Sequence, residues 1–96
     1  DFARPAVEIH NQVRGLSGWP TAYTMFEGKL LKIRRTRLVP DAQGHPGEVI
    51  DVKKLIVACG AGALELCEVQ LEGKQTVSGE AFANGHRLAT HSLLTE

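Results

Sequence analysis

The stretch TAYTMFEGKLLKIRRTRLVP, residues 21–40, indicates the fold class because it holds two β-rich segments joined by a Glu-Gly turn. In the second segment Leu31 and Ile33 lie on one face of a strand, whereas Leu38 has the opposite parity. One extra residue, a β-bulge, returns Leu38 to the buried face, and small barrels bend their strands with such bulges. The stretch therefore predicts a bulged strand of a small barrel.

Three more β-rich segments follow, with Gly-containing turn signals at residues 41–47, 60–62 and 72–73. They are GEVIDV (47–52), KLIVACG (54–60) and ALELCEVQLEG (63–73). The last segment also changes parity, from Leu64 and Leu66 to Val69 and Leu71. The connections are too short for helical crossovers, so we predict antiparallel pairing. The predicted fold class is mainly β, a small antiparallel barrel of about five strands over residues 20–73, with a flat sandwich as the alternative that the bulges disfavour.

A helix is expected before the barrel, over residues 4–14. Its apolar positions recur every three or four residues and form one stripe: Phe2, Ala6, Ile9, Val13 and Leu16. Pro5 suits the first turn, and Gly15 suits a left-handed stop after the last turn. Trp19, the only Trp of the chain, lies in a Gly-Trp-Pro corner and is expected to pack where the helix meets the barrel.

A short second helix is expected over residues 79–84, with Ser78 as its N-cap and with Ala81 and Phe82 facing inward. Residues 88–96 show no clear periodicity and are expected to form a loose tail. At 96 residues the chain has the size of one domain, so we assign residues 1–96 to a single domain. The chain begins with Asp1 rather than Met, and we expect it to be part of a longer protein.

The composition predicts an ordinary globular protein. Lys and Arg together number 11, as do Asp and Glu, so the net charge predicts neither nucleic-acid nor membrane binding. No apolar run is as long as a membrane span, so we expect a soluble protein without membrane contact. Cys59 and Cys67 lie in apolar β-rich segments and are expected to be free thiols in a reducing compartment.

No motif predicts chemistry within the chain itself. The four His residues are scattered, and the spacing of the two Cys residues matches no zinc motif, so no metal site is expected. Neither a Gly-x-Ser-x-Gly elbow nor a Gly-rich phosphate loop is present. We therefore expect no catalytic residue and no cofactor site in this chain.

The clearest local anomaly is a cluster of positive charge in a segment without acidic residues. Its five members are Lys29, Lys32, Arg34, Arg35 and Arg37. Alternate residues of a strand share a face, so Lys32 and Arg34 form a positive ribbon suited to phosphates. The alternative is an edge strand whose charges prevent sheet-to-sheet aggregation. Of the nearby aromatic residues, Phe26 is expected in the core, whereas Tyr23 is open to either base stacking or packing.

Five segments, in order, resemble the carboxy-terminal domain of the methionyl-tRNA formyltransferase family. They are DFARPAVEIHNQVRGL, WPTAYTMFEGKLLKI, PGEVI, LIVACGAGALELCEVQLEGK and FANGHRL, and they span Asp1 to Leu88. The corner at Trp19 is similar to the family's Pro-Trp-Pro-Gly-Ala, with Gly18 in place of Pro and Thr21 in place of Gly. Similar domains follow the catalytic domains of sugar-nucleotide formyltransferases and occur in formyltetrahydrofolate dehydrogenases.

The resemblance implies an OB-like barrel that follows an N-terminal Rossmann-like catalytic domain. Enzymes of this family transfer a formyl group from 10-formyltetrahydrofolate to the methionine of initiator methionyl-tRNA, in cytoplasmic, bacterial-type translation. Their catalytic residues and folate pocket belong to the N-terminal domain, so this chain alone is expected to be inactive. In such enzymes the barrel holds the acceptor arm of the tRNA by contacting the phosphate backbone of the RNA.

The resemblance also ranks the basic residues as tRNA contacts. Lys32 and Arg34 come first, followed by Lys29, Arg35 and Arg37, with Arg14, Lys53, Lys54 and Arg87 as weaker candidates. The alternative function is that of an interface barrel in a sugar-nucleotide formyltransferase, without RNA contact.

Overall fold

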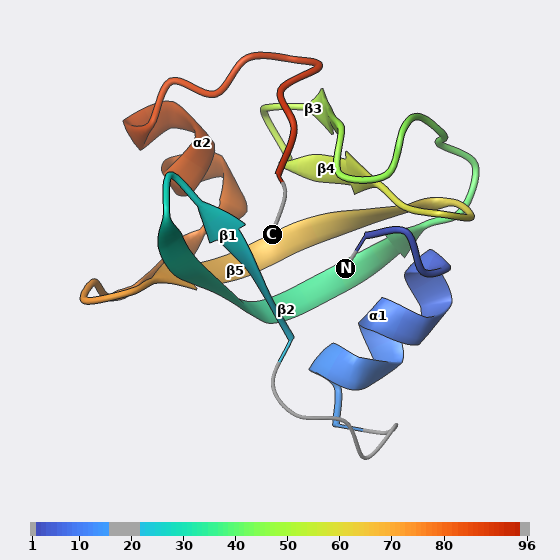
Figure 1. Cartoon of the computed structure of the whole chain (residues 1–96), viewed down its shortest axis with the longest axis horizontal. Helices are drawn as coiled ribbons and strands as arrows, with labels where there is room; N and C mark the ends of the chain where they lie inside the picture. Colours follow the sequence, from blue (N-terminus) through green and yellow to red (C-terminus); the bar gives the residue numbers. More distant parts are fainter. Residues whose placement is uncertain (1, 16–21, 95–96) are drawn as a thin grey trace.

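The computed structural model describes residues 2–15 and 22–94, and the expected packing of Trp19 lies outside the described residues. Within these described residues, six strands and two helices follow one another (Figure 1). Their bounds are α1 Ala6–Val13, β1 Tyr23–Phe26, β2 Lys29–Val39, β3 Val49–Asp51, β4 Ile56–Ala58, β5 Ala63–Leu71, β6 Thr76–Ser78 and α2 Gly79–Gly85. The mainly β fold with a helix near each end of the chain is confirmed.

The strands form one antiparallel sheet in the order β1-β2-β5-β4-β3. The sixth strand, β6, which the sequence did not predict, pairs with β5 beyond the short stretch that β4 covers. Among the described residues β1 and β3 do not pair, so the sheet is barrel-like without closing. The long β2–β5 pair crosses the middle of the molecule, with α1 and α2 on either side of it (Figure 1).

Two β-bulges face each other where β2 pairs with β5. The register around them is Ile33↔Val69, Arg35↔Glu68 and Thr36↔Leu66. Arg34 in β2 and Cys67 in β5 are therefore the extra residues, one in each strand. Because both strands gain one residue at the same level, the core-facing positions before and after the bulges stay paired with each other. Both changes of parity expected from the sequence are confirmed.

The helices close the two sides of the core. Ala6 and Ile9 of α1 are buried together with Phe2, which precedes the helix, and Gly15, at φ +77°, ends the helix in the left-handed conformation. On α2 the Ser78 hydroxyl accepts a hydrogen bond from the Ala81 amide at 3.0 Å, as expected for an N-cap. Ala81 itself is exposed, because Phe82 and Ala83 are the residues that this short helix buries.

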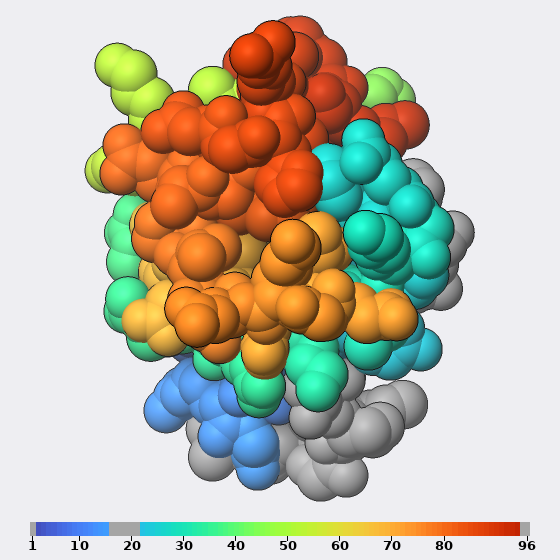
Figure 2. Space-filling view, turned by 90° about the vertical axis from the view of Figure 1, so that its left-hand side faces the viewer, coloured from blue at the N-terminus to red at the C-terminus, as the bar shows by residue number. Residues whose placement is uncertain are grey.

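An aromatic cluster joins α2 to β1. The Phe82 ring meets the Phe26 ring edge-on at 5.0 Å, and the His86 ring lies 4.5 Å from Phe82. Figure 2 shows this side of the molecule, where the orange residues of α2 pack against the cyan residues of β1. Phe26 therefore belongs to the core, as expected.

The expectation of a loose tail over 88–96 is wrong for the described residues 88–94. The Leu94 amide donates to the Gly47 carbonyl at 2.8 Å, and the Val49 amide donates to the Ser92 carbonyl at 2.7 Å. The Leu94 side chain is buried in the core. A segment without periodicity is ordered here because its backbone pairs with the residues that lead into β3.

Neither helix in the described part of the chain has the length and apolarity that crossing a membrane requires. Both cysteines are free thiols, as expected. Burial raises the pKa of the Cys59 thiol to about 11. Within residues 2–15 and 22–94, no three His, Cys, Asp or Glu side chains gather as a metal site would need.

Candidate nucleic-acid interface

The bulge in β2 gathers the basic cluster on the outer face of the sheet, which is the face turned away from the core. Ile33 and Thr36 are buried on the inner face, and the residues between them both point outward because Arg34 is the bulged residue. Without the bulge, strand alternation would turn Arg35 and Arg37 away from Lys32. Four of the five basic residues thus share the outer face: Lys32, Arg34, Arg35 and Arg37.

The strand register sets a row of polar residues across this face. Tyr23 pairs with Lys32, Lys32 pairs with Gln70, and Gln70 pairs with Thr76. Directly opposite residues project from the same face of a sheet, so these four form one outer row over β1, β2, β5 and β6. The Tyr23 side chain is half exposed, which places it on the surface rather than in the core.

Arg34 is held in place by a neutral partner. Its Nε and Nη2 atoms donate to the Gln70 Oε1 atom at 3.1 and 2.6 Å. Gln70 is fixed in turn, because its Nε2 atom donates to the Lys74 carbonyl at 3.0 Å. An amide oxygen carries no net charge, so this anchorage orients the guanidinium and leaves its positive charge uncompensated. Among the described residues, neither Lys32 nor Arg34 has a carboxylate in ion-pair contact.

Arg35 and Arg37 lie on the same face with carboxylate partners. The Arg35 Nε atom is 3.2 Å from the Glu68 carboxylate, and the Arg37 Nη2 atom is 2.7 Å from that of Glu65. Both glutamates come from β5, at the cross-strand positions of the two arginines. These exposed pairs reduce the local positive charge, although each stabilises the fold by only about 0–1 kcal/mol.

The other candidates lie apart from the outer row. Lys29 pairs with Phe26 at the start of β2, beside the hairpin turn. Arg14 follows the last residue of α1, and Arg87 follows α2. Lys53 and Lys54 lie together in the turn between β3 and β4. The edge-strand interpretation is wrong for the first part of β2, where β1 pairs with residues 29–32. Beyond Ile33 the described strands pair β2 with β5 alone, so Arg34, Arg35 and Arg37 lie along an edge of the sheet.

Strand alternation predicts Lys32 and Arg34 on one face, but Arg35 and Arg37, which it assigns to the other face, join them in the structure. The signal was available, since the same change of parity that predicts the bulge also turns the residues beyond it. No such signal in the sequence shows that Arg35 and Arg37 are neutralised by glutamates. Glu65 and Glu68 lie about thirty residues away in the chain, and only the register of β2 on β5 brings them opposite the arginines.

Comparison with known proteins agrees with this architecture. The family model described as formyl transferase, C-terminal domain, matches residues 1–87. The chain is 50% identical to the methionyl-tRNA formyltransferase of Solibacter usitatus, with 100% of the chain and 31% of that protein aligned. It is 44% identical to the methionyl-tRNA formyltransferase of Cereibacter sphaeroides, with 99% of the chain and 30% of that protein aligned.

A third relative, the methionyl-tRNA formyltransferase of Clostridium novyi, is 38% identical over 98% of the chain and 31% of its own length. The chain therefore spans about three tenths of the length of the curated relatives it matches. The family match covers nearly the whole chain and includes both helices and all the strands that form the outer row. The chain belongs to the formyl transferase C-terminal domain family.

Proposed function

We propose that this chain is the tRNA-binding domain of a methionyl-tRNA formyltransferase, and that its outer face holds phosphates of the acceptor arm of initiator methionyl-tRNA. The proposal is carried by one observation: Lys32 and Arg34 lie on the same face, and Gln70 orients Arg34 without neutralising its charge. Two such cations on one face are more available to backbone phosphates than cations that are already paired with carboxylates. The similarity to methionyl-tRNA formyltransferases supports RNA as the partner.

The proposed division of labour assigns binding to this chain and chemistry to another domain. An N-terminal Rossmann-like domain of the same cytoplasmic enzyme would bind 10-formyltetrahydrofolate and transfer its formyl group to the amino group of methionine. Lys32 and Arg34 would contribute by positioning the acceptor arm, since phosphate contacts fix orientation without reading sequence. Gln70 preorganises Arg34 for this contact, because its amide is itself anchored to the Lys74 carbonyl.

The experiment is steady-state kinetics of the full-length enzyme with Lys32→Ala/Arg34→Ala. We expect the KM for initiator methionyl-tRNA to rise about tenfold, because a loss of about 1.4 kcal/mol in binding is a factor of ten. The kcat and the KM for 10-formyltetrahydrofolate should change little, since the lost contact serves binding rather than chemistry. The control is Lys32→Arg/Arg34→Lys, which keeps both charges. An unchanged KM for the tRNA would contradict the proposal and favour an interface barrel without RNA contact.

A further inference from the structure

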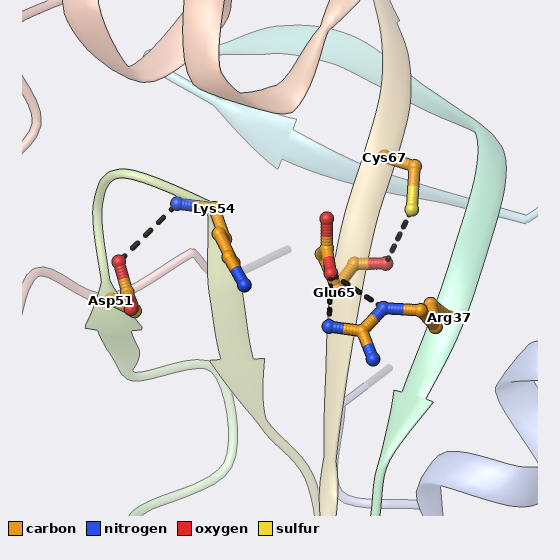
Figure 3. A network of polar contacts seen from close by, with 5 residues as sticks. All are labelled: Arg37, Asp51, Lys54, Glu65 and Cys67. Atoms are coloured by element: carbon orange, nitrogen blue, oxygen red, sulfur yellow. Dashed lines mark hydrogen bonds and ion pairs between the residues drawn. The ribbon is translucent and has the colours of Figure 1, made fainter.

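A second basic surface lies at the bulge, and its lining does not include Lys32 or Arg34. An open hollow of about 310 Å³ lies between β2, β5, the start of α2 and the turn that joins β3 to β4. Its lining includes four cations and two carboxylates: Arg35, Arg37, Lys53, Lys54, Glu65 and Glu80. We call it the lysine-turn hollow. Figure 3 shows the side chain of Lys54 directed toward the Arg37–Glu65 pair.

The turn that carries the two lysines is held firmly. The Asp51 carboxylate accepts hydrogen bonds from the Lys53 and Lys54 amides at 2.8 and 3.2 Å. The next residue, Leu55, is fully buried and adopts φ +46°, a left-handed conformation that strains a residue with a branched side chain. Its carbonyl accepts a hydrogen bond from the Leu66 amide at 3.0 Å. These contacts fix the lysines beside the bulge.

The opposite wall is fixed as well. A Cβ atom at Gly79 would lie only 1.9 Å from the Leu66 carbonyl oxygen, so the backbone of α2 rests directly on β5. The backbone that frames the lysine-turn hollow is therefore in place before any ligand binds, whereas its basic side chains are exposed. Preformed sites bind at a lower entropic cost than sites that must be ordered.

The charges in the hollow favour an anion. No ion pair of Lys53 or Lys54 is found within the described residues. Arg37 contacts Glu65 through Nε and Nη2, and a guanidinium has further N–H donors for a second partner. Arg35 and Arg37 are already paired with Glu68 and Glu65, so the positive charge left for an anion comes from Lys53 and Lys54, against Glu80 in the lining. The space is large enough for a phosphate group.

We propose that the lysine-turn hollow binds a second phosphate of the RNA backbone, separate from the contact at Lys32 and Arg34. This inference rests on the proposed function, because it takes the same RNA as its ligand. Arg35 and Arg37, which line the hollow, follow Lys32 and Arg34 on the outer side of β2 and so connect the two sites. The hollow thus extends the interface from the outer row toward the β3–β4 turn.

The first test is binding of initiator tRNA to the full-length protein with Lys53→Ala/Lys54→Ala. We expect the affinity to fall about fivefold and the slope of log K against log salt to drop by about 1, as for one lost phosphate contact. Lys53→Arg/Lys54→Arg keeps the charges and should bind as the wild type does. Affinity and slope unchanged in Lys53→Ala/Lys54→Ala, with Lys32→Ala/Arg34→Ala weakened, would overturn this inference alone. If both double variants bound normally, the proposed function would fail with it.

The second test locates the ligand through Cys67, which lines the hollow. Burial raises the pKa of the Cys67 thiol, so alkylation is followed at alkaline pH and assigned by mass spectrometry. Bound tRNA should slow alkylation of Cys67 in the wild type but not in Lys53→Ala/Lys54→Ala. Equal protection by inorganic phosphate, at the same concentration of phosphate groups, would overturn the RNA assignment and indicate a small-anion site.

Discussion

The two halves of the outer side of β2 carry the same kinds of residue in different electrostatic settings. In the first half, which ends at the bulged residue, Lys32 pairs with the neutral Gln70 and Arg34 is hydrogen-bonded to it. Beyond it, Arg35 and Arg37 lie opposite Glu68 and Glu65. A cluster of basic residues in a sequence therefore does not give the charge that is available to a ligand. That charge depends on which strand pairs with the cluster and in which register.

Both halves depend on the buried side chains beneath the bulge. Removing one of these side chains should have the largest effect, and the effect is on stability. Leu66→Ala removes a fully buried side chain opposite Thr36 and should lower the free energy of unfolding by about 2–5 kcal/mol. The measurement is urea denaturation. Leu93→Ala is the control, since that side chain is exposed and its loss should change stability by less than about 0.5 kcal/mol. Equal effects of the two changes would contradict the assigned core.

The contrast between the halves predicts unequal losses of RNA affinity. Lys32→Ala/Arg34→Ala should weaken binding of initiator tRNA about tenfold, whereas Arg35→Ala/Arg37→Ala should weaken it about threefold. The difference is expected because the second pair is already partly neutralised by glutamates. Both double variants remove two charges, so each serves as the control of the other. Equal losses would show that the carboxylate partners do not matter.

Removing the two carboxylates should make the two halves of the outer side of β2 contribute more equally to tRNA affinity. Glu65→Gln/Glu68→Gln releases Arg35 and Arg37 from their partners and should tighten tRNA binding about twofold to threefold. The gain should disappear when Arg35 and Arg37 are also replaced by Ala. Filter binding or fluorescence anisotropy at low salt measures both effects. A gain that persists without the arginines would mean that the outer face responds only to net charge.

The smallest expected effect concerns the inner side of β2, where the Nδ1 atom of His10 and the hydroxyl of Thr36 are hydrogen-bonded at 2.6 Å. Burial, and then the nearby Arg14, lower the pKa of His10 from its ordinary value of 6.5. The unfolded chain therefore binds this proton more readily, and stability should fall as the pH drops through 6.5 toward the lower, folded pKa.

The measurement is the thermal midpoint at pH 7.0 and at pH 5.5, for the wild type and for His10→Gln. The decrease at the lower pH should be smaller in the variant, because glutamine does not titrate. A decrease of the same size in both proteins would mean that other groups cause it. Glu48, whose pKa is lowered mainly by its hydrogen bond with His91, affects stability only at more acidic pH.

Much of the fold was predictable because it follows from local patterns. The parity changes at Leu38 and Val69 revealed both bulges, and Ser78 marked the start of α2. Strand β6 was missed because its three residues are all exposed and give no alternation of burial. The C-terminal segment was misjudged because its order comes from backbone hydrogen bonds to residues 47–49, which no side-chain pattern records.

The sequence predicts which basic residues belong to the candidate site, but it does not predict which of them are neutralised by a partner. The five basic residues stand out in the sequence, and the proposed leading pair, Lys32 and Arg34, depends only on strand alternation. The roles of Gln70 and of the two glutamates depend on pairing between β2 and β5, which joins residues about thirty positions apart. Such register cannot be read from either strand alone.

We propose that the outer side of β2 binds the phosphate backbone of initiator tRNA. The most direct test is the affinity of the full-length protein for this tRNA across a salt series, with and without Lys32→Ala/Arg34→Ala. We expect a steep fall of affinity with salt in the wild type, and a slope lower by about 2 in the variant. Identical slopes and affinities for the two proteins would contradict the claim.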